Sequence, residues 1–178
     1  MIRLFAALAV PDETAEELAR RQFGIDGARW RPRQALHVTL RFFGEIPEDA
    51  ARDLDAELLT PRAGAFEITL EGAGAFGEGS EIHAVWAGVA ESPELRRLAK
   101  ACEAAARRAG LPPDRRHYRP HLTLAYLRRP DPVDVAAWVQ ANNLFRSPPI
   151  RIESFGLYSS VLGHGGSTYR LEAEYPLA

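Results

Sequence analysis

Two histidines of this chain stand in nearly the same four-residue phrase. His37 opens HVTL and His121 opens HLTL, although the chain has only five histidines. Both phrases lie in apolar, β-branched segments that predict strands, in which side chains alternate between two faces. Each strand would bury its aliphatic side chains on one face and present an imidazole and a hydroxyl on the other. The sequence therefore predicts two polar His-x-Thr faces, His37 with Thr39 and His121 with Thr123.

Two imidazoles and two hydroxyls suit proton transfer at a phosphate. Histidine, with a reference pKa of about 6.5, can give or take a proton near neutrality. Displacement at phosphorus needs a base for the incoming oxygen and an acid for the departing one. Threonine hydroxyls and arginines can hold the non-bridging oxygens. This chemistry needs neither a metal nor another cofactor, and none is expected.

Other readings of these residues are weaker. A zinc site would need three or four His, Cys or carboxylate ligands, and neither phrase carries an acid or thiol at ligand spacing. A serine hydrolase would need a phrase such as G-x-S-x-G, which the sequence lacks. A single His-x-Thr strand is more often structural, but two copies in one chain favour a shared site.

Arginines near the two phrases are candidates for binding an anion. Arg41 shares the face of His37 and Thr39 by alternation, and Arg119 lies two residues before His121, so both could reach a phosphate. The segments that precede the phrases, ARWRPRQALH and DRRHYRPH, are basic. They offer five arginines that could guide RNA to the site: Arg29, Arg31, Arg33, Arg115 and Arg116.

Aromatic residues near the phrases are candidates for stacking on a base. Trp30 and Tyr118 lie in the two basic segments, and Phe5 lies in the first expected strand. Phe42 has the opposite parity to His37 and is expected in the core. The remaining histidines near these segments, His83 and His117, have no motif around them and are expected to be structural or on the surface.

Helices and strands alternate in the expected order of elements. Prolines and acids mark helix starts, and Gly110 marks a helix end. The expected helices are 11–23, 47–59, 93–109 and 132–141. The expected strands are 2–10, 36–43, 65–76, 81–90, 121–127, 150–160 and 167–177.

A repeat connects these elements. At the 84-residue offset between the two histidines, FEITLEGAG falls on IRIESFGLY, and the helix that starts near Pro47 falls within one residue of the helix from Pro132. The chain is therefore expected to form two similar lobes, each with one His-x-Thr phrase. A pseudo-twofold arrangement would place the two motif strands side by side and make their polar faces line one cleft.

The composition of the chain limits its fold, its partners and its compartment. A chain of 178 residues with 46% hydrophobic residues can form a proper core, and we expect one domain over 1–178. The net charge of −2 offers no general attraction to nucleic acid. A single cysteine suits a reducing compartment, which favours the cytoplasm, and the N-terminal apolar run is too short to span a membrane.

Several segments together resemble a known family. LHVTLRFFGE, RPHLTLAYL, the opening RLFAALAVP and the closing SFGLYSSVLGHGGSTYRLEAEYPL are similar to the 2H phosphoesterases, and more narrowly to the RNA 2′,3′-cyclic phosphodiesterases, also named 2′-5′ RNA ligases. The resemblance implies a bilobal α+β fold, with antiparallel sheets lining a central cleft and helices outside. It also implies a monomer that acts, without a metal, on RNA ends carrying a 2′,3′-cyclic phosphate, such as tRNA fragments.

The resemblance assigns roles to the two motifs. It makes His37 the proton donor to the leaving oxygen and His121 the base that activates water, with Thr39 and Thr123 binding the phosphate. The expected product is an RNA 2′-phosphate. Reversible 2′-5′ ligation would use the same acid and base, so the sequence fits both reactions. The alternatives are a phosphodiesterase for small cyclic-phosphate nucleotides and an inactive RNA-binding module, which the intact His and Thr in both motifs disfavour.

Overall fold

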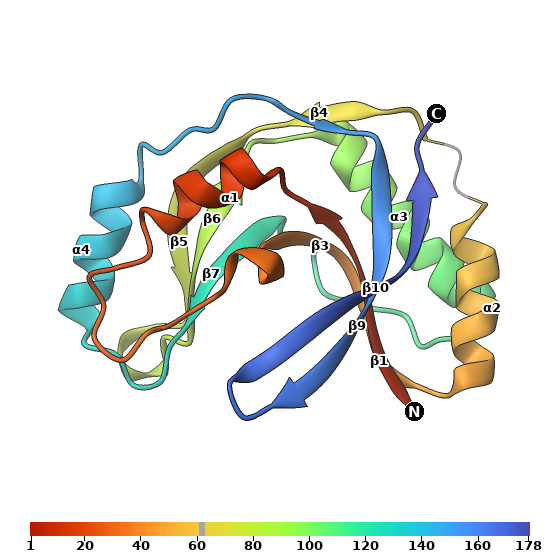
Figure 1. Ribbon diagram of the computed structural model, residues 1–178, viewed down its shortest axis with the longest axis horizontal. Helices are drawn as coiled ribbons and strands as arrows, with labels where there is room; N and C mark the ends of the chain where they lie inside the picture. Colours follow the sequence, from red (N-terminus) through yellow and green to blue (C-terminus); the bar gives the residue numbers. More distant parts are fainter. Residues whose placement is uncertain (61–62) are drawn as a thin grey trace.

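Two four-stranded antiparallel sheets form the centre of the molecule (Figure 1). The computed structural model describes residues 1–60 and 63–178. The first sheet has the order β10-β9-β1-β3, and the second has the order β2-β7-β6-β5. The first comprises β1 (Ile2–Ala9), β3 (His37–Ile46), β9 (Ser154–Gly163) and β10 (Gly166–Pro176). The second comprises β2 (Arg29–Trp30), β5 (Leu70–Phe76), β6 (Ala84–Val89) and β7 (His121–Tyr126). A separate pair joins β4 (Phe66–Ile68) to β8 (Ile150–Ile152).

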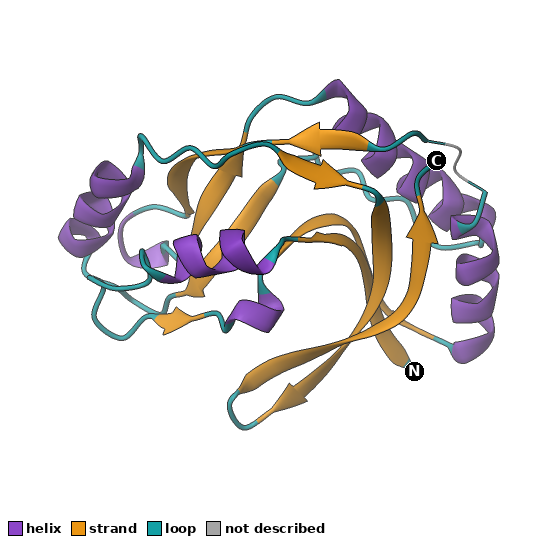
Figure 2. Ribbon diagram, turned by 45° about the horizontal axis from the view of Figure 1, so that its top comes forward, coloured by secondary structure: helices purple, strands orange, loops and turns teal. Residues whose placement is uncertain are grey.

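Helices lie outside the sheets, two with each sheet (Figures 1 and 2). α2 (Glu48–Leu58) packs on α3 (Pro93–Arg108), and α3 packs on β3 of the first sheet. α4 (Pro132–Asn142) contacts β5 of the second sheet. α1 (Asp12–Ala19) leads into Arg21, which bonds to Asn142 of α4. Each sheet thus has one face covered by helices and one face left for a site.

The repeat expected from the sequence is present in the fold. α2 and α4 each have 11 residues, β4 and β8 each have three, and the second member of each pair starts 84 residues after the first. The α+β class and the bilobal pseudo-twofold arrangement are confirmed. The two-residue β2 and the short 3₁₀ turns at Arg33–Ala35 and Gly79–Glu81 were not expected.

Three of the expected elements differ markedly from the structure. The strands expected over 65–76 and 150–160 are each broken, at Thr69 and Glu153, because the chain leaves the β4–β8 pair there to join a larger sheet. The first helix ends at Ala19 and not near Phe23. Backbone N–H groups of residues 21 and 22 donate three residues back, which tightens the helix into a turn.

A β-bulge follows each His-x-Thr phrase and changes which face the next residues occupy. On β3, Thr39 pairs with Ala7 and Arg41 pairs with Ala6, which leaves Leu40 as an extra residue. On β7, the pairing of Thr123 and Ala125 leaves Leu124 extra in the same way. Because a bulge inserts one residue, the alternation inverts beyond it. Side chains on β3 and β7 therefore alternate regularly from the histidine to the threonine of each motif, but not beyond the bulge.

The apolar faces of both sheets belong to one hydrophobic core cluster. It includes Leu8 and Val38 from the first sheet and Val85 and Leu122 from the second. β3 and β7 lie side by side where the sheets meet, as Figure 1 shows. The core therefore fixes the relative position of the two motif strands. Among the described residues, no helix is long and apolar enough to cross a membrane.

Candidate active site

His37 and His121 have matching hydrogen bonds. The Nδ1 of His37 lies 2.7 Å from the carbonyl oxygen of Ala35, and the Nδ1 of His121 lies 2.7 Å from that of Arg119. A carbonyl oxygen can only accept, so each Nδ1 carries a proton and donates it. In the neutral ring, the proton-accepting nitrogen is then Nε2. The same orientation occurs in both lobes, at positions related by the repeat.

Both imidazoles favour the neutral form in the free protein. Burial is the main cause of the lowering of the His37 pKa from 6.5 to about 4, and the nearby charges of Arg31 and His121 add to it. The hydrogen bond to Ala35 acts in the opposite direction. Burial also lowers the pKa of His121, and the charge of Arg119 lowers it further. Because the charge of His121 is among the causes of the lowered pKa of His37, the two rings lie near each other.

The two threonines lie on the faces that carry the histidines. Thr39 and Thr123 are both half-buried, and within residues 1–60 and 63–178 neither hydroxyl has a hydrogen-bond partner. Tyr118 connects the two motifs, because its hydroxyl donates to the carbonyl oxygen of Thr39 at 2.8 Å. Tyr118 was expected to stack on a base, but its hydroxyl holds the segment before β7 against β3. Burial raises the pKa of this hydroxyl, which keeps it protonated as a donor.

An aromatic wall supports His37. Phe5 stacks on the imidazole with ring centroids 4.8 Å apart, and Tyr169 meets the imidazole edge-on at 5.2 Å. Tyr158 stacks on Phe5 at 5.5 Å. Phe5 was expected to stack on a base. That expectation is corrected, because Phe5 is only 3% exposed and its ring is covered by these neighbours. Its role is to hold the imidazole.

A second aromatic wall supports His121. Phe76 meets the imidazole edge-on at 4.8 Å, and Trp86 packs against both rings. Gly74 makes room for Trp86, since a Cβ at residue 74 would lie 2.4 Å from the indole ring. Arg119 lies over Phe76 at 5.2 Å and remains exposed, so it keeps the position from which it could reach a phosphate.

The expected positions of three side chains, Arg41, Phe42 and Trp30, are wrong. Arg41 and Phe42 each lie on a different face of the strand from the one expected. Beyond the bulge at Leu40, Arg41 is buried and bonds to Glu103 of α3 at 2.5 Å, so it does not share the face of His37. Phe42 was expected in the core, but it is 36% exposed and pairs with Phe5. Trp30 was expected to stack on a base, but it packs on Trp138 of α4 at 6.1 Å.

Several residues of the site were not identified from the sequence. They are Tyr158, Tyr169, Phe76, Trp86 and Tyr126. Tyr158, Tyr169, Phe76 and Trp86 lie on other strands of the two sheets, and a sequence does not state which strands pair; Tyr126 lies beyond the bulge on β7. Only Tyr126 had a usable signal, because it stands at the repeat position of Phe42.

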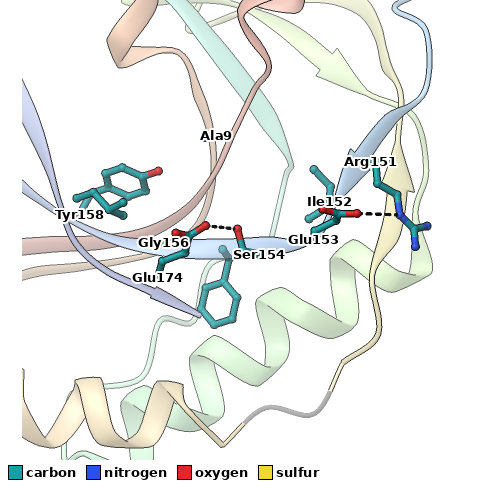
Figure 3. Close-up of a pocket in the computed structure, with 10 residues that line it drawn as sticks. Ala9, Arg151, Ile152, Glu153, Ser154, Gly156, Tyr158 and Glu174 are labelled. Atoms are coloured by element: carbon teal, nitrogen blue, oxygen red, sulfur yellow. Dashed lines mark hydrogen bonds and ion pairs between the residues drawn. The ribbon is translucent and has the colours of Figure 1, made fainter. Parts of the chain in front are cut away.

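A hollow opens beside this site on the first sheet (Figure 3). Ala9, whose strand position is paired with His37, lines it together with Tyr158 and Gly156. Glu174 accepts a hydrogen bond from Ser154 at 2.7 Å along its edge. The hollow holds about 360 Å³ and is open to solvent. It shares Tyr158 with the aromatic wall of His37, because Tyr158 stacks on Phe5.

The arginines of the basic segments are in different environments. Arg33 pairs with Glu16 and Arg116 pairs with Asp114, whereas Arg29 and Arg115 are exposed. Arg31 is buried next to the aromatic wall of His37. Within residues 1–60 and 63–178, no three His, Cys, Asp or Glu residues gather in a metal-binding arrangement.

Comparisons with known proteins agree on one family. Residues 10–163 match the 2′-5′ RNA ligase superfamily. An Archaeoglobus fulgidus protein named RNA 2′,3′-cyclic phosphodiesterase is 30% identical over 95% of this chain and 97% of its own length. A Thermus thermophilus protein of the same name is 29% identical over 99% of this chain and 90% of its own length.

Solved structures give the same result. The Thermus thermophilus protein TT0787 superposes with a TM-score of 0.81 and 26% identity, over 99% of this chain and 98% of that one. Escherichia coli LigT complexed with 3′-AMP superposes with a TM-score of 0.78 and 26% identity, over the same shares. These likenesses extend over the whole length of the sheets that carry the two histidines.

Proposed function

Because this chain belongs to the 2′-5′ RNA ligase superfamily, we propose that it hydrolyses RNA 2′,3′-cyclic phosphate ends to 2′-phosphates by two-histidine acid–base catalysis. Relatives of nearly the same length carry the name RNA 2′,3′-cyclic phosphodiesterase. A related structure contains 3′-AMP, a nucleotide with its phosphate on the ribose. An RNA end with a phosphate on its ribose is the corresponding ligand for this chain.

The matched hydrogen bonds of the two histidines carry this proposal. Each Nδ1 is occupied by a carbonyl, so each Nε2 is left for proton transfer. His121 Nε2 takes a proton from water as the water oxygen forms a bond to phosphorus. His37 Nε2 gives its proton to the 3′ oxygen as the bond from phosphorus to that oxygen breaks. Thr39, Thr123 and Arg119 hold the non-bridging oxygens.

The environment of His37 sets a condition on this mechanism. Burial and nearby cations keep His37 neutral in the free protein, yet a general acid must start protonated. An anionic phosphate beside the ring favours the imidazolium and raises its pKa. Substrate binding therefore causes His37 to take up the proton that it later donates. After one turnover His37 is neutral and His121 is protonated, and exchange with solvent resets both.

Ligation would use the same groups with a different nucleophile. A 5′-hydroxyl in place of water would give a 2′-5′ linkage, with the same bond to the 3′ oxygen breaking. Water at roughly 55 M competes unless the second RNA end is held tightly, so hydrolysis is the main reaction that we propose. Action as a monomer, in the cytoplasm and on tRNA fragments remains a prediction.

The test compares RNA oligomers that end in a 2′,3′-cyclic phosphate with cyclic mononucleotides. We expect the oligomers to be opened to 2′-phosphates with a higher kcat/KM than the mononucleotides. Reaction of the mononucleotides alone would replace RNA with small cyclic-phosphate nucleotides as substrates. Binding without turnover of either substrate would instead indicate an RNA-binding module.

A further inference from the structure

Arg31 occupies the space between the two lobes. It directly follows β2, and its backbone N–H donates to Leu124 of β7 at 2.8 Å. Its guanidinium lies over Tyr126 of β7 at 5.5 Å and over Tyr169 of β10 at 5.4 Å. One Nη donates to the carbonyl oxygen of Ser167 at 3.2 Å. The side chain thus extends from the second sheet to the first, beside the aromatic wall of His37.

The guanidinium of Arg31 has no acidic partner among the described residues, although it is only 9% exposed. Arg41, the other arginine with 9% exposure, is paired with Glu103 at 2.5 Å. A buried cation is costly unless an anion compensates for it, and contacts with two tyrosine rings compensate only in part. Within the same residues, no side chain or carbonyl accepts from its Nε or second Nη. These donors are left for a ligand.

We propose that Arg31 binds the phosphate of the substrate directly, as a planar donor that completes the site between His37 and the tyrosines. Guanidinium N–H groups match the oxygens of a phosphate in a two-point contact. The cation stands on the His37 side of the cleft, whereas Arg119 stands on the His121 side. The two arginines would hold the phosphate from opposite sides, each beside one of the histidines.

This role also accounts for the proton on His37. In the free protein, Arg31 disfavours the imidazolium, since two cations would lie close together. A phosphate bound to Arg31 offsets that cation and places negative charge beside the ring. The pKa of His37 then rises when the substrate binds. Arg31 therefore couples phosphate binding to protonation of the general acid.

The inference rests on the proposed function for its mechanism, but it is tested by binding alone. Inorganic phosphate is titrated into the intact wild-type chain while the side-chain Nε–H resonance of Arg31 is followed by NMR. We expect a saturable shift of Arg31 together with a rise in the His37 pKa. An Arg31 resonance that does not move as phosphate saturates the protein would overturn the inference.

Two variants separate phosphate binding from support of the fold. Arg31→Gln should weaken inorganic phosphate binding by about 10- to 100-fold and raise the pKa of His37 in the free protein. Arg31→Lys keeps the charge but loses the planar fork, so it should fall between. Arg97→Gln is the matched control, because Arg97 is exposed on α3 and pairs with Glu94. Equal phosphate affinity in Arg31→Gln and Arg97→Gln would contradict the proposal.

Loss of the proposed function would appear differently. If the wild-type chain fails to open a cyclic phosphate but Arg31 still responds to inorganic phosphate, the reaction is wrong and the phosphate-binding site stands. If the wild-type chain opens the cyclic phosphate and Arg31→Gln does so with unchanged kcat/KM, the reaction stands and the role of Arg31 is wrong.

Discussion

At the scale of single residues, the two histidines are held in the same way but in different surroundings. Each donates Nδ1–H to a backbone carbonyl two residues earlier, and each packs against aromatic rings. His37 is the more deeply buried ring, and its pKa is lowered to about 4. The more deeply buried ring is the proposed acid, so His37 needs the negative charge of a bound phosphate before it can donate a proton.

Removal of either imidazole should abolish most of the activity. We predict that His37→Ala and His121→Ala each lower kcat/KM by about 10²- to 10⁴-fold, since each loses one proton-transfer group. The double variant should be little worse than either single variant, because the two residues act as a unit. Single-turnover rates on one cyclic-phosphate substrate measure this, with circular dichroism as the control for folding. Near-normal turnover by one single variant would show that the histidines do not share a reaction.

The lowered pKa values predict where the pH profile lies. The active form has one protonated and one neutral histidine, so kcat/KM should be bell-shaped. Both free-protein pKa values lie below 6.5, so both limbs should fall below pH 6.5. The limbs of kcat should lie higher, because the bound phosphate favours the imidazolium. Rates measured from pH 4 to 9 report apparent values for the coupled pair. A kcat/KM that keeps rising above pH 7 would contradict this assignment.

At the scale of elements, the bulge after each motif decides which neighbours belong to the site. It turns Arg41 toward α3, where Glu103 and the carbonyl oxygen of Pro112 accept from its guanidinium. It also brings Phe42 to the side of Phe5. Arg41 therefore contributes to the packing of α3 on β3, and Arg31 supplies the cation on the His37 side of the cleft.

Arg41→Met tests this division. We predict that it lowers the free energy of unfolding by about 1–3 kcal/mol, because Glu103 loses a buried charge-assisted partner. It should leave inorganic phosphate affinity unchanged. Urea unfolding and phosphate titration on the same sample measure the two effects. A large loss of phosphate affinity in a folded Arg41→Met protein would return Arg41 to the site.

The elements could be predicted from the sequence more fully than the neighbours within the site. Proline and acidic residues at helix starts, apolar periodicity and the 84-residue repeat were sufficient for the helices and for the two motif strands. Phe42 and Arg41 were misplaced because regular alternation was assumed through a bulge, and a bulge has no reliable sequence signal. Trp30 was misplaced because it was taken to lie in a loop, whereas it lies on β2 and packs on Trp138. Tyr169 and Trp86 depend on strand pairing between distant segments, which the sequence leaves open.

At the scale of the whole molecule, the two basic segments offer fewer unpaired, exposed arginines than the sequence suggested. Arg33 and Arg116 are paired with acids and Arg31 is buried, so Arg29 and Arg115 remain from the five expected to guide RNA. The net charge of the chain is −2. Along these two segments, a long RNA would therefore gain only a few phosphate contacts beyond its reactive end.

The salt dependence of KM should differ slightly between long and short substrates. We predict that raising the salt concentration increases KM more for a long RNA than for a cyclic mononucleotide, because the long RNA releases counterions at Arg29 and Arg115. Replacing both arginines with glutamine should remove the difference. Equal salt dependence of KM for the two substrates would eliminate these residues as an RNA path and leave the catalytic site unaffected.

The most direct test of the central claim is the identity of the product formed from an RNA oligomer with a 2′,3′-cyclic phosphate, in the presence of EDTA. Phosphorus NMR distinguishes the cyclic phosphate, the 2′-phosphate and the 3′-phosphate in one sample. We predict complete conversion to the 2′-phosphate at a rate that EDTA does not change, because imidazoles, hydroxyls and arginines supply the chemistry. A 3′-phosphate product would contradict proton donation by His37 to the 3′ oxygen, and a loss of rate that zinc or manganese restores would contradict metal-free catalysis by His37 and His121.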